Sequence, residues 1–494
     1  MHGPLYDRRV ATTRLGSLPW YRRVPPYQWG PKVRRRTELG LLLLGDAIVV
    51  ALYVLASLAE RSRIPPHIGW FFAILLALTI VPHLANRWLA PEANPIILPI
   101  VAVLNGIGYV VIARWDPADA KAQAGWTAIG VVLYVTTLLV VRRPRDLDRY
   151  RYLLLLLAGL LILSPLFPGI GESVGGARLW VHLGSLSFQP IELAKILLCI
   201  FFASYFAENK ELLSIPTARV GNRLVVDFRP LIPIVILCGL ALGAIGLEGD
   251  IAFAVIIFVL FVAMLWTATG RLGYLLLGLA LFAAAALLAS HLFTQVHVRV
   301  ADWLDPWRWT SSSPQCATPT QLARHPLCGT GDQLVQGWFA MGNGGIGGTG
   351  IGLGVWPQYH GIYLYSITSD MIFAAIGEEL GLLGTSAVAL AFLLIVGAGL
   401  RIAQTARSDF SRLLATGLTV VLGFQAFFIM AGVTRLLPFT GITLPFMAYG
   451  GSSLIANYIL IAILMRISEE GAATPAERRS GVSQPGERAF VRAM

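Results

Sequence analysis

The chain has 494 residues, of which 56% are hydrophobic and only 13% are charged, and its formal net charge is +11 at pH 7. Soluble globular domains carry about 25% charged residues, so this composition excludes an ordinary soluble protein. Repeated apolar runs instead predict an all-α, polytopic membrane protein in which one helical bundle takes up the whole chain. The basic residues gather in tails and loops, where they orient a membrane protein, so we expect no nucleic-acid partner.

The N-terminal segment is basic. Residues 1–38 contain nine basic residues and no apolar core. A cleavable signal peptide requires such a core. We therefore interpret residues 1–38 as a cytosolic tail.

Twelve apolar runs follow, and each is a candidate membrane-spanning helix. They lie near residues 39–59, 68–88, 96–114, 124–141, 152–167, 189–207, 230–247, 251–268, 272–292, 371–400, 413–433 and 452–466.

The charges between the runs test this assignment, because cytosolic loops carry an excess of Arg and Lys. If residue 1 is cytosolic, the basic loops all fall inside: 142–151 with five arginines, 208–229 with four basic residues and 401–412 with three. The tail at 469–494 is then also cytosolic. Residues 293–370 become one large outer loop, rich in Trp, Gly and Pro, which we expect to be ordered and functional.

The four cysteines divide into two pairs. Cys199 and Cys238 lie inside apolar runs, as packing residues do. Cys316 and Cys328 lie in the outer loop, where an oxidising compartment would allow a disulfide that closes a short loop.

Ionisable residues follow the fifth apolar run, in the stretch GGARLWVHLGSLSFQPIELAKILL (residues 175–198). Glu192 and Lys195 are three residues apart and share one helix face. They form either a structural ion pair or part of a polar cavity. Arg178 is a candidate anion ligand on the outer side, or else a headgroup contact. Glu248 and Asp250 lie between two later runs, either in a solvated turn or in a site.

A glycine-rich stretch, MGNGGIGGTGIGLG, covers residues 341–354 and contains eight glycines. The spacing G-x-G-x-x-G occurs in it, but that spacing indicates dinucleotide binding only between a strand and a helix of a βαβ unit. In an outer loop of a membrane protein we reject that reading. A bending loop, or close approach of the backbone to a ligand, remains open.

Three carboxylates surround the start of the tenth run. Asp370 lies at the membrane edge, where capping by Ser369 or Asp370 is the simpler role. Glu378 and Glu379 lie inside the run, and at least one of them should be buried and partnered. Farther on, the Pro- and Gly-broken segment LPFTGITLPFMAYGGSS (residues 437–453) is either a loop or the lining of a cavity.

Taken in order, these stretches resemble the SEDS family, the membrane glycosyltransferases of bacterial cell-wall synthesis. The segments that carry the resemblance are GARLWVHLGSLSFQPIELAK, AMGNGGIGGTGIGLG, SDMIFAAIGEELGLLG and LPFTGITLPFMAYGGSS. It covers roughly residues 95–468, so residues 39–94 would be two helices added to a ten-helix core. The end of the chain resembles the RodA branch of the family more than the FtsW branch. Ile191 stands where the family has serine, and EGDIAF keeps only Asp250 of its motif.

The stretch VRVADWLDPWRW (residues 298–309) contains an element similar to the family's Arg-x-x-x-x-Leu-Asp-Pro. Asp305 falls on the aspartate regarded as catalytic there, and we expect it to act as general base. Asp302 lies outside the motif and is expected to be a solvated neighbour. The other residues expected to bind substrate are Arg178, Arg299, Glu192, Lys195 and Asp370.

The resemblance implies that the protein polymerises lipid II on the outer face of the bacterial cytoplasmic membrane, for elongation and shape. A sugar hydroxyl of one lipid II attacks the anomeric carbon of another with inversion, and arginines bind the leaving diphosphate. No cofactor is evident, although a divalent cation could help to neutralise the diphosphate. The implied partner is a class B penicillin-binding protein, a transpeptidase.

Two other functions stay open. A lipid II flippase would use the charges Glu192, Lys195, Glu378 and Glu379 inside the membrane. A non-catalytic scaffold for the transpeptidase would need no single carboxylate.

Overall fold

A computed structural model describes residues 31–64, 68–174, 177–183, 186–214, 218–220, 223–225, 231–311, 313, 329–355 and 366–472. The helices are α1 (Pro31–Arg61), α2 (Ile68–Leu89), α3 (Ile97–Trp115), α4 (Pro117–Val140), α5 (Arg151–Leu163), α6 (Ile191–Ser214), α7 (Ile232–Glu248), α8 (Ile251–Thr269), α9 (Leu272–Leu292), α10 (Thr294–Leu304), α12 (Asp332–Gly344), α13 (Ile372–Thr405), α14 (Asp409–Val433) and α15 (Gly451–Ala472). The 3₁₀ turns are η1 (Pro144–Tyr150), η2 (Ser164–Leu166) and η4 (Pro306–Trp309).

The prediction of a helical, polytopic membrane bundle is confirmed. Each of the twelve predicted runs coincides with a helix. Within the described residues, ten helical segments are long and apolar enough to cross a membrane. The two exceptions are α6, which carries charges near both ends, and α7, whose apolar part is short. The count of twelve spans therefore stays a prediction.

Two small antiparallel sheets, which the sequence did not indicate, lie between helices. The first has the order β1 (Gly171–Val174), β2 (Ala177–Leu183) and β3 (Leu186–Phe188), and it separates α5 from α6. The second pairs β4 (Ala218–Val220) with β5 (Arg223–Val225), between α6 and α7.

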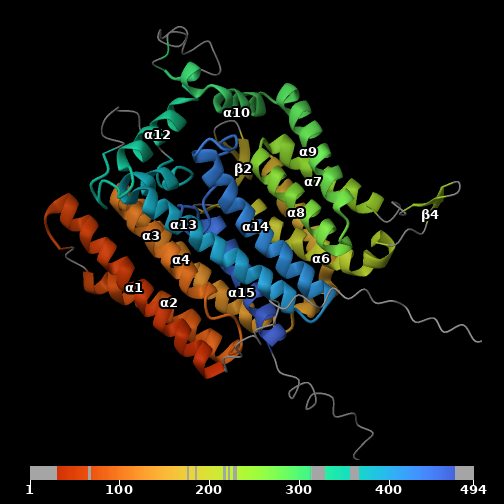
Figure 1. The fold of residues 1–494 in the computed structure, drawn as a ribbon, viewed down its shortest axis with the longest axis horizontal. Coiled ribbons are helices and arrows are strands. Elements are labelled where there is room, and N and C mark those ends of the chain that lie inside the picture. The colour runs from red at the N-terminus through yellow and green to blue at the C-terminus, as the bar shows by residue number, and fades with distance from the viewer. Residues whose placement is uncertain are drawn as a thin grey trace, which may run out of the picture.

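The last helices form the centre of the bundle. In Figure 1, α13, α14 and α15 run between α1–α4 on one side and α6–α9 on the other. α15 packs against α4, α13, α14 and α6, and most of its residues are buried. Small residues allow the close approach: a Cβ at Gly130 of α4 would lie 2.5 Å from the Tyr458 ring of α15. Such small-residue contacts are typical of helix packing in membranes.

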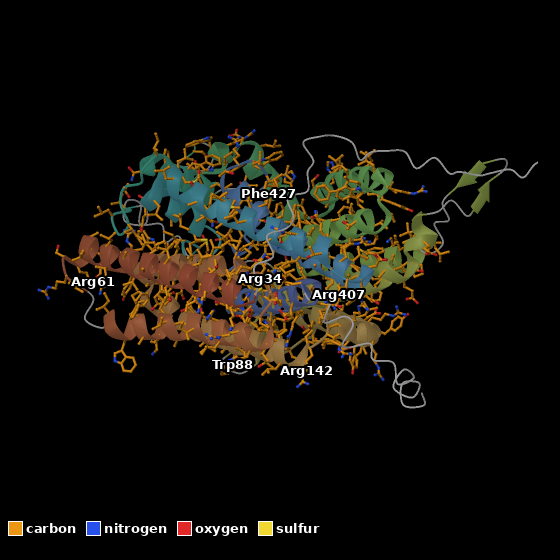
Figure 2. The ribbon with its side chains drawn as sticks, turned by 60° about the horizontal axis from the view of Figure 1, so that its bottom comes forward. Arg34, Arg61, Trp88, Arg142, Arg407 and Phe427 are labelled. Carbon is orange, nitrogen blue, oxygen red and sulfur yellow. The ribbon has the colours of Figure 1, made fainter. Side chains whose placement is uncertain are left out.

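The two ends of the bundle differ in chemistry. One end collects the basic connections: Lys210 pairs with Asp409 at 3.2 Å, and Arg145 with Glu470 at 3.4 Å. The other end carries α10, η4 and α12 (Figure 1). Figure 2 places Arg61, at the end of α1, far from Arg142 and Arg407. The basic connections thus lie together, away from the loop predicted to be outside.

The helix α1 begins at Pro31, so residues 31–38, expected in the basic tail, are helical. Proline suits the first turn of a helix because its missing N–H would be unpaired there. Arg35 and Glu38 form a buried ion pair, and Glu38 also accepts a 2.8 Å hydrogen bond from His83 Nδ1 of α2. Burying this pair requires the helix to extend back past residue 38.

We predict that Glu38→Ala lowers the stability of the folded protein by about 3 kcal/mol, because it leaves Arg35 buried without its carboxylate. Thermal unfolding in detergent checks this. The control is Glu60→Ala, which removes a 41% exposed carboxylate from the same helix. Equal unfolding temperatures for the two variants would contradict the prediction.

Candidate functional site

The two aspartates of α10 have opposite environments. Asp302 is buried, with 3% of its surface exposed, and its Oδ1 accepts a 2.7 Å hydrogen bond from Thr330 Oγ1. Burial raises the pKa of the Asp302 carboxyl, against the opposing effects of Thr330 and Arg299. The expectation that Asp302 is a solvated neighbour is therefore wrong, because its face of α10 packs onto the turn before α12.

Asp305 is exposed where α10 ends. Its backbone N–H still bonds to the carbonyl of Ala301 at 3.0 Å, and its Oδ1 accepts a 3.4 Å bond from the amide of Arg308. Pro306 follows it as the first residue of η4 and is buried. The carboxylate of Asp305 thus projects from a fixed junction between two helical turns and remains open to a substrate.

Arg435, just after α14, holds this junction. It has the left-handed φ of +62°, and its guanidinium donates to the carbonyls of Trp303 (3.0 Å) and Leu304 (2.7 Å). The indole of Trp303 donates back to the Arg435 carbonyl at 3.1 Å. The last carbonyls of a helix have no partner within it, and a cation there is favourable. Arg435 therefore fixes the end of α10, beside Asp305. We call this set of contacts between Arg435, Trp303 and Leu304 the Arg435 clamp.

Arg299 and Asp370 converge on Gly441 of the broken segment. A Cβ at Gly441 would lie 3.3 Å from Asp370 Oδ2 and 3.6 Å from Arg299 Nη2, and its φ is +74°. Arg299 also lies over the Phe439 ring, 5.6 Å from its centre. Gln333 of α12 reaches Asp370 Oδ1 at 3.5 Å. Four stretches that are separate in the sequence thus meet in one cluster.

The charge of Asp370 is set by this cluster. Burial raises the pKa of its carboxyl to about 6, while Arg299 and the hydroxyl groups of Ser366 and Ser369 oppose the shift. Asp370 therefore gains a negative charge near neutral pH, next to a guanidinium that can pair with it.

Glu192 and Lys195 are fully buried and bind each other. The Lys195 ammonium also donates to Gln425 Oε1 of α14 at 2.7 Å, and Gln425 Nε2 donates to the Thr443 carbonyl at 3.1 Å. These contacts connect α6 to the broken segment. They favour the structural reading of the pair.

Glu248 and Asp250 are buried as well, so the solvated turn is excluded. Asp250 caps α8 by accepting from the amide of Phe253 at 3.1 Å. Gly249 between them has a φ of +82°, and Gln295 of α10 lies against it. This turn therefore supports the start of α10.

The glycine-rich stretch wraps the start of α13. The amides of Thr349 and Gly350 bond to the carbonyls of Glu378 (2.9 Å) and Glu379 (3.1 Å), next to a non-helical residue, Gly381. Glu378 accepts from the Val355 amide at 2.9 Å.

Glu379 pairs with the buried Arg114 of α3. Both glutamates are buried, as expected for at least one of them, and they have structural partners.

Arg178 belongs to the small sheet between α5 and α6. It is exposed on β2, in the sheet that packs on α7. None of the hydrogen bonds and ion pairs among the described residues links it to Arg299 or Asp370.

The cysteines and possible metal ligands add little. Cys316 and Cys328 fall outside the described residues, and Cys199 and Cys238 are free and buried. Among the residues with described positions, no three His, Cys, Asp or Glu side chains are placed to hold a metal ion.

Sequence reasoning missed two contributors, Arg435 and Gln333. Neither belongs to a motif with its own chemistry. The one signal for Arg435 is that it is a charged residue two positions before the broken segment.

We predict that Arg435→Ala speeds amide hydrogen exchange across residues 302–309, because it leaves two helix-terminal carbonyls without a donor. A local loss of about 1.4 kcal/mol corresponds to roughly tenfold faster exchange. Alanine and arginine are similarly unfavourable at the positive φ of residue 435, so the substitution tests only the loss of the guanidinium side chain. Exchange measured by mass spectrometry in detergent is the test, with Arg401→Ala at the opposite end as control. Unchanged exchange at 302–309 would show that the clamp does not hold α10.

Comparisons with known proteins agree with this architecture. The peptidoglycan glycosyltransferase RodA of Mycobacterium tuberculosis (strain H37Rv) is 36% identical over 464 residues, covering 92% of this chain and 94% of the relative. The RodA of Mycobacterium leprae is 35% identical over 453 residues, covering 89% and 91%. A probable peptidoglycan glycosyltransferase FtsW of Geobacter metallireducens is 33% identical, covering 77% and 96%.

Two solved structures share the fold. The rod shape determining protein RodA of Thermus thermophilus has a TM-score of 0.52 and 23% identity, covering 78% of this chain and all of that one. A chain from a study of polymerization and crosslinking by a peptidoglycan synthase complex has a TM-score of 0.57 and 24% identity, covering 76% and 97%. The FtsW/RodA/SpoVE family model, described as cell cycle protein, matches residues 96–472. The chain therefore belongs to the FtsW/RodA/SpoVE family, with α1 and α2 outside the matched residues.

Proposed function

We propose that this chain is a peptidoglycan glycosyltransferase that polymerises lipid II into glycan strands at the outer face of the bacterial cytoplasmic membrane. The observation that carries the proposal is the exposed Asp305 carboxylate, fixed at the end of α10 by the Arg435 clamp. The names of the mycobacterial relatives support the same activity. Their coverage of 89–92% of the chain, against 77% for an FtsW relative, supports a role in elongation and shape.

The reaction is one displacement. A sugar hydroxyl of one lipid II forms a bond to the anomeric carbon of a second, and the bond from that carbon to the lipid-linked diphosphate breaks. Asp305 accepts the hydroxyl proton, which makes the oxygen a better nucleophile. The configuration at the anomeric carbon inverts.

The departing diphosphate gathers negative charge, and guanidinium groups bind such charge bidentately. Arg299 is our first candidate, because it lies on α10 three residues before Asp302, and Asp305 caps the end of the same helix. Asp370 and Phe439 orient its guanidinium. Arg178 is a second candidate, since Figure 1 places β2 at the same end of the bundle as α10.

In this proposal Glu192 and Lys195 do not contact the substrate but support the residues that do. Their contact with Gln425 holds the broken segment and hence Gly441, against which Arg299 and Asp370 lie. A flippase would need these charges in an open path, and their mutual pairing argues for a fixed frame.

The proposed topology places both termini in the cytosol and α10 outside. The grouping of basic connections at the end opposite α10 supports it, because positive loops remain cytosolic. The proposed partner is a class B penicillin-binding protein, which would crosslink the strands. A fold shared with a chain of a peptidoglycan synthase complex supports such a pairing.

The test is polymerisation of labelled lipid II by the purified protein, with its transpeptidase partner present. We expect Asp305→Asn to lower the rate by roughly 10²–10⁴-fold, the usual contribution of a general base. Asp305 is exposed, so the variant should remain folded. Asp409→Asn, at an exposed carboxylate of the opposite end, is the matched control and should stay active.

Equal strand formation by wild type and Asp305→Asn would remove Asp305 as the base. Transfer of lipid II across liposomes without polymerisation would favour the flippase. If every carboxylate variant activates the transpeptidase fully and none forms glycan strands, the scaffold function would be favoured.

The pKa of Asp370 predicts a pH dependence. Below pH 6 its carboxyl is protonated and cannot pair with Arg299, so wild-type activity should fall by up to about tenfold per pH unit. Above pH 6 the carboxylate is charged and again attracts the nearby Arg299 guanidinium, so the activity levels off. Asp370→Asn stays neutral at every pH, so it should be slow throughout and lack the change near pH 6. Polymerisation rates from pH 5 to 8 check this, and an unchanged inflection in the variant would assign it to another group.

A further inference from the structure

A cavity separates the helix pair α1–α2 from the family core. It has a volume of about 270 Å³, is open on one side and lies between α1, α2, α3, α4 and α15. Protein interiors contain few voids larger than one water molecule, which takes ~30 Å³. A space of this size is therefore a built feature that must be filled.

The mouth of the cavity faces the surroundings of the bundle. Two of its lining residues on α2, Trp70 and Ile74, are 72% and 50% exposed. They lie on a helix of 22 residues with the hydropathy of a membrane span. Their surroundings in the membrane are hydrocarbon, so a lipid chain can enter sideways from the bilayer.

Several polar side chains that line the cavity have hydrogen-bond partners. Asn105 Nδ2 donates to Tyr458 OH at 3.1 Å and to Thr127 Oγ1 at 3.4 Å. Thr79 Oγ1 donates to the buried Asp46 at 2.9 Å. Most of the other lining residues are apolar, among them Ile74, Leu78 and Leu98, so the space favours an apolar occupant.

Stacked aromatic rings close one end. Tyr53 of α1 stacks on Phe71 of α2 at 4.2 Å, and Phe71 on Tyr109 of α3 at 5.5 Å. The stack ties both added helices to α3 and gives the cavity a flat, apolar wall.

We propose that this cavity binds one acyl chain of a membrane phospholipid, which fills the space between the added helix pair and the core. The volume equals that of roughly nine water molecules, and a methylene group occupies a similar space. About half of an acyl chain therefore fits, with the headgroup outside. A polyprenyl chain, several times longer, would leave most of its length uncovered.

The bound chain would also support the broken segment. Tyr458, at the floor of the cavity, contacts the Phe446 ring edge-on at 5.6 Å. Gly108 of α3 packs against the backbone of Met447, where a Cβ would lie 2.2 Å from the carbonyl oxygen. An occupied cavity thus holds α3 and Tyr458 in contact with the segment that contains Gly441.

The experiment is native mass spectrometry of the full chain, released from nanodiscs that contain phospholipid and polyprenyl phosphate in equal amounts. Ala124→Phe places a ring in the cavity, and Ala102→Leu is a milder filling variant in case the first does not fold. Ile129→Phe, at a 45% exposed position of the same α4, is the matched control. We expect one retained phospholipid on wild type and control, and at least tenfold less on the filled variants.

Three results would overturn the proposal. The first is equal phospholipid retention by wild type and by filled variants with wild-type unfolding temperatures. The second is a wild type that retains no lipid. The third is preferential retention of polyprenyl phosphate, which would assign the cavity to a substrate-type lipid.

Discussion

The structure depends on one constraint. Inside a membrane protein, backbone N–H and C=O groups that are not paired within a helix must find other hydrogen-bond partners in the protein. The broken segment at residues 437–453 is the main case. Its carbonyls at Thr443 and Ala448 accept from Gln425 and Gln123, and its amide at Tyr449 donates to the Thr368 carbonyl. Side chains from α4 and α14 thus replace the missing helix. Because this segment carries Gly441, the same pairing fixes where Arg299 and Asp370 meet.

The same constraint explains the buried charges. An ionisable group at membrane depth is costly unless it is paired, so Glu192, Lys195, Glu378 and Glu379 first suggest a transport path. They instead have structural partners: Glu192 binds Lys195, which acts through Gln425, and the two glutamates accept from Asn343 and Gly352 of the glycine-rich stretch. Their charge makes these hydrogen bonds stronger than neutral ones. The carboxylates inside the bundle therefore hold the frame, and the exposed Asp305 is left for chemistry.

Hydropathy was sufficient to predict the long apolar helices, because apolar runs of membrane length have few alternatives, but it did not indicate α10 and α12 in the outer loop. The family motifs pointed to Asp305, Arg299 and Asp370 as site residues, and the fold brings the last two together at Gly441. The burial of Asp302 and the exposure of Asp305 were not predictable from the sequence. The two residues are only three positions apart, and the difference arises because the side of α10 that carries Asp302 packs on Thr330. Arg435 was missed because its hydrogen bonds are with Trp303 and Leu304, which are far from it in the sequence. The start of α1 was missed because a buried Arg–Glu pair looks, in sequence, like a charged tail.

The position of Asp305 follows from this division of roles. A general base must reach a substrate that arrives from the membrane surface, so its carboxylate has to be accessible. An exposed side chain on a free loop would not keep one geometry, and a shift of about 1 Å can cost two orders of magnitude in rate. The fold resolves this conflict by fixing what lies around Asp305: Asp302, one turn before it, and Pro306, directly after it, are buried, and the carbonyls of Trp303 and Leu304 are paired with Arg435. The accessible carboxylate is therefore held by neighbours whose positions are fixed by burial or by hydrogen bonds.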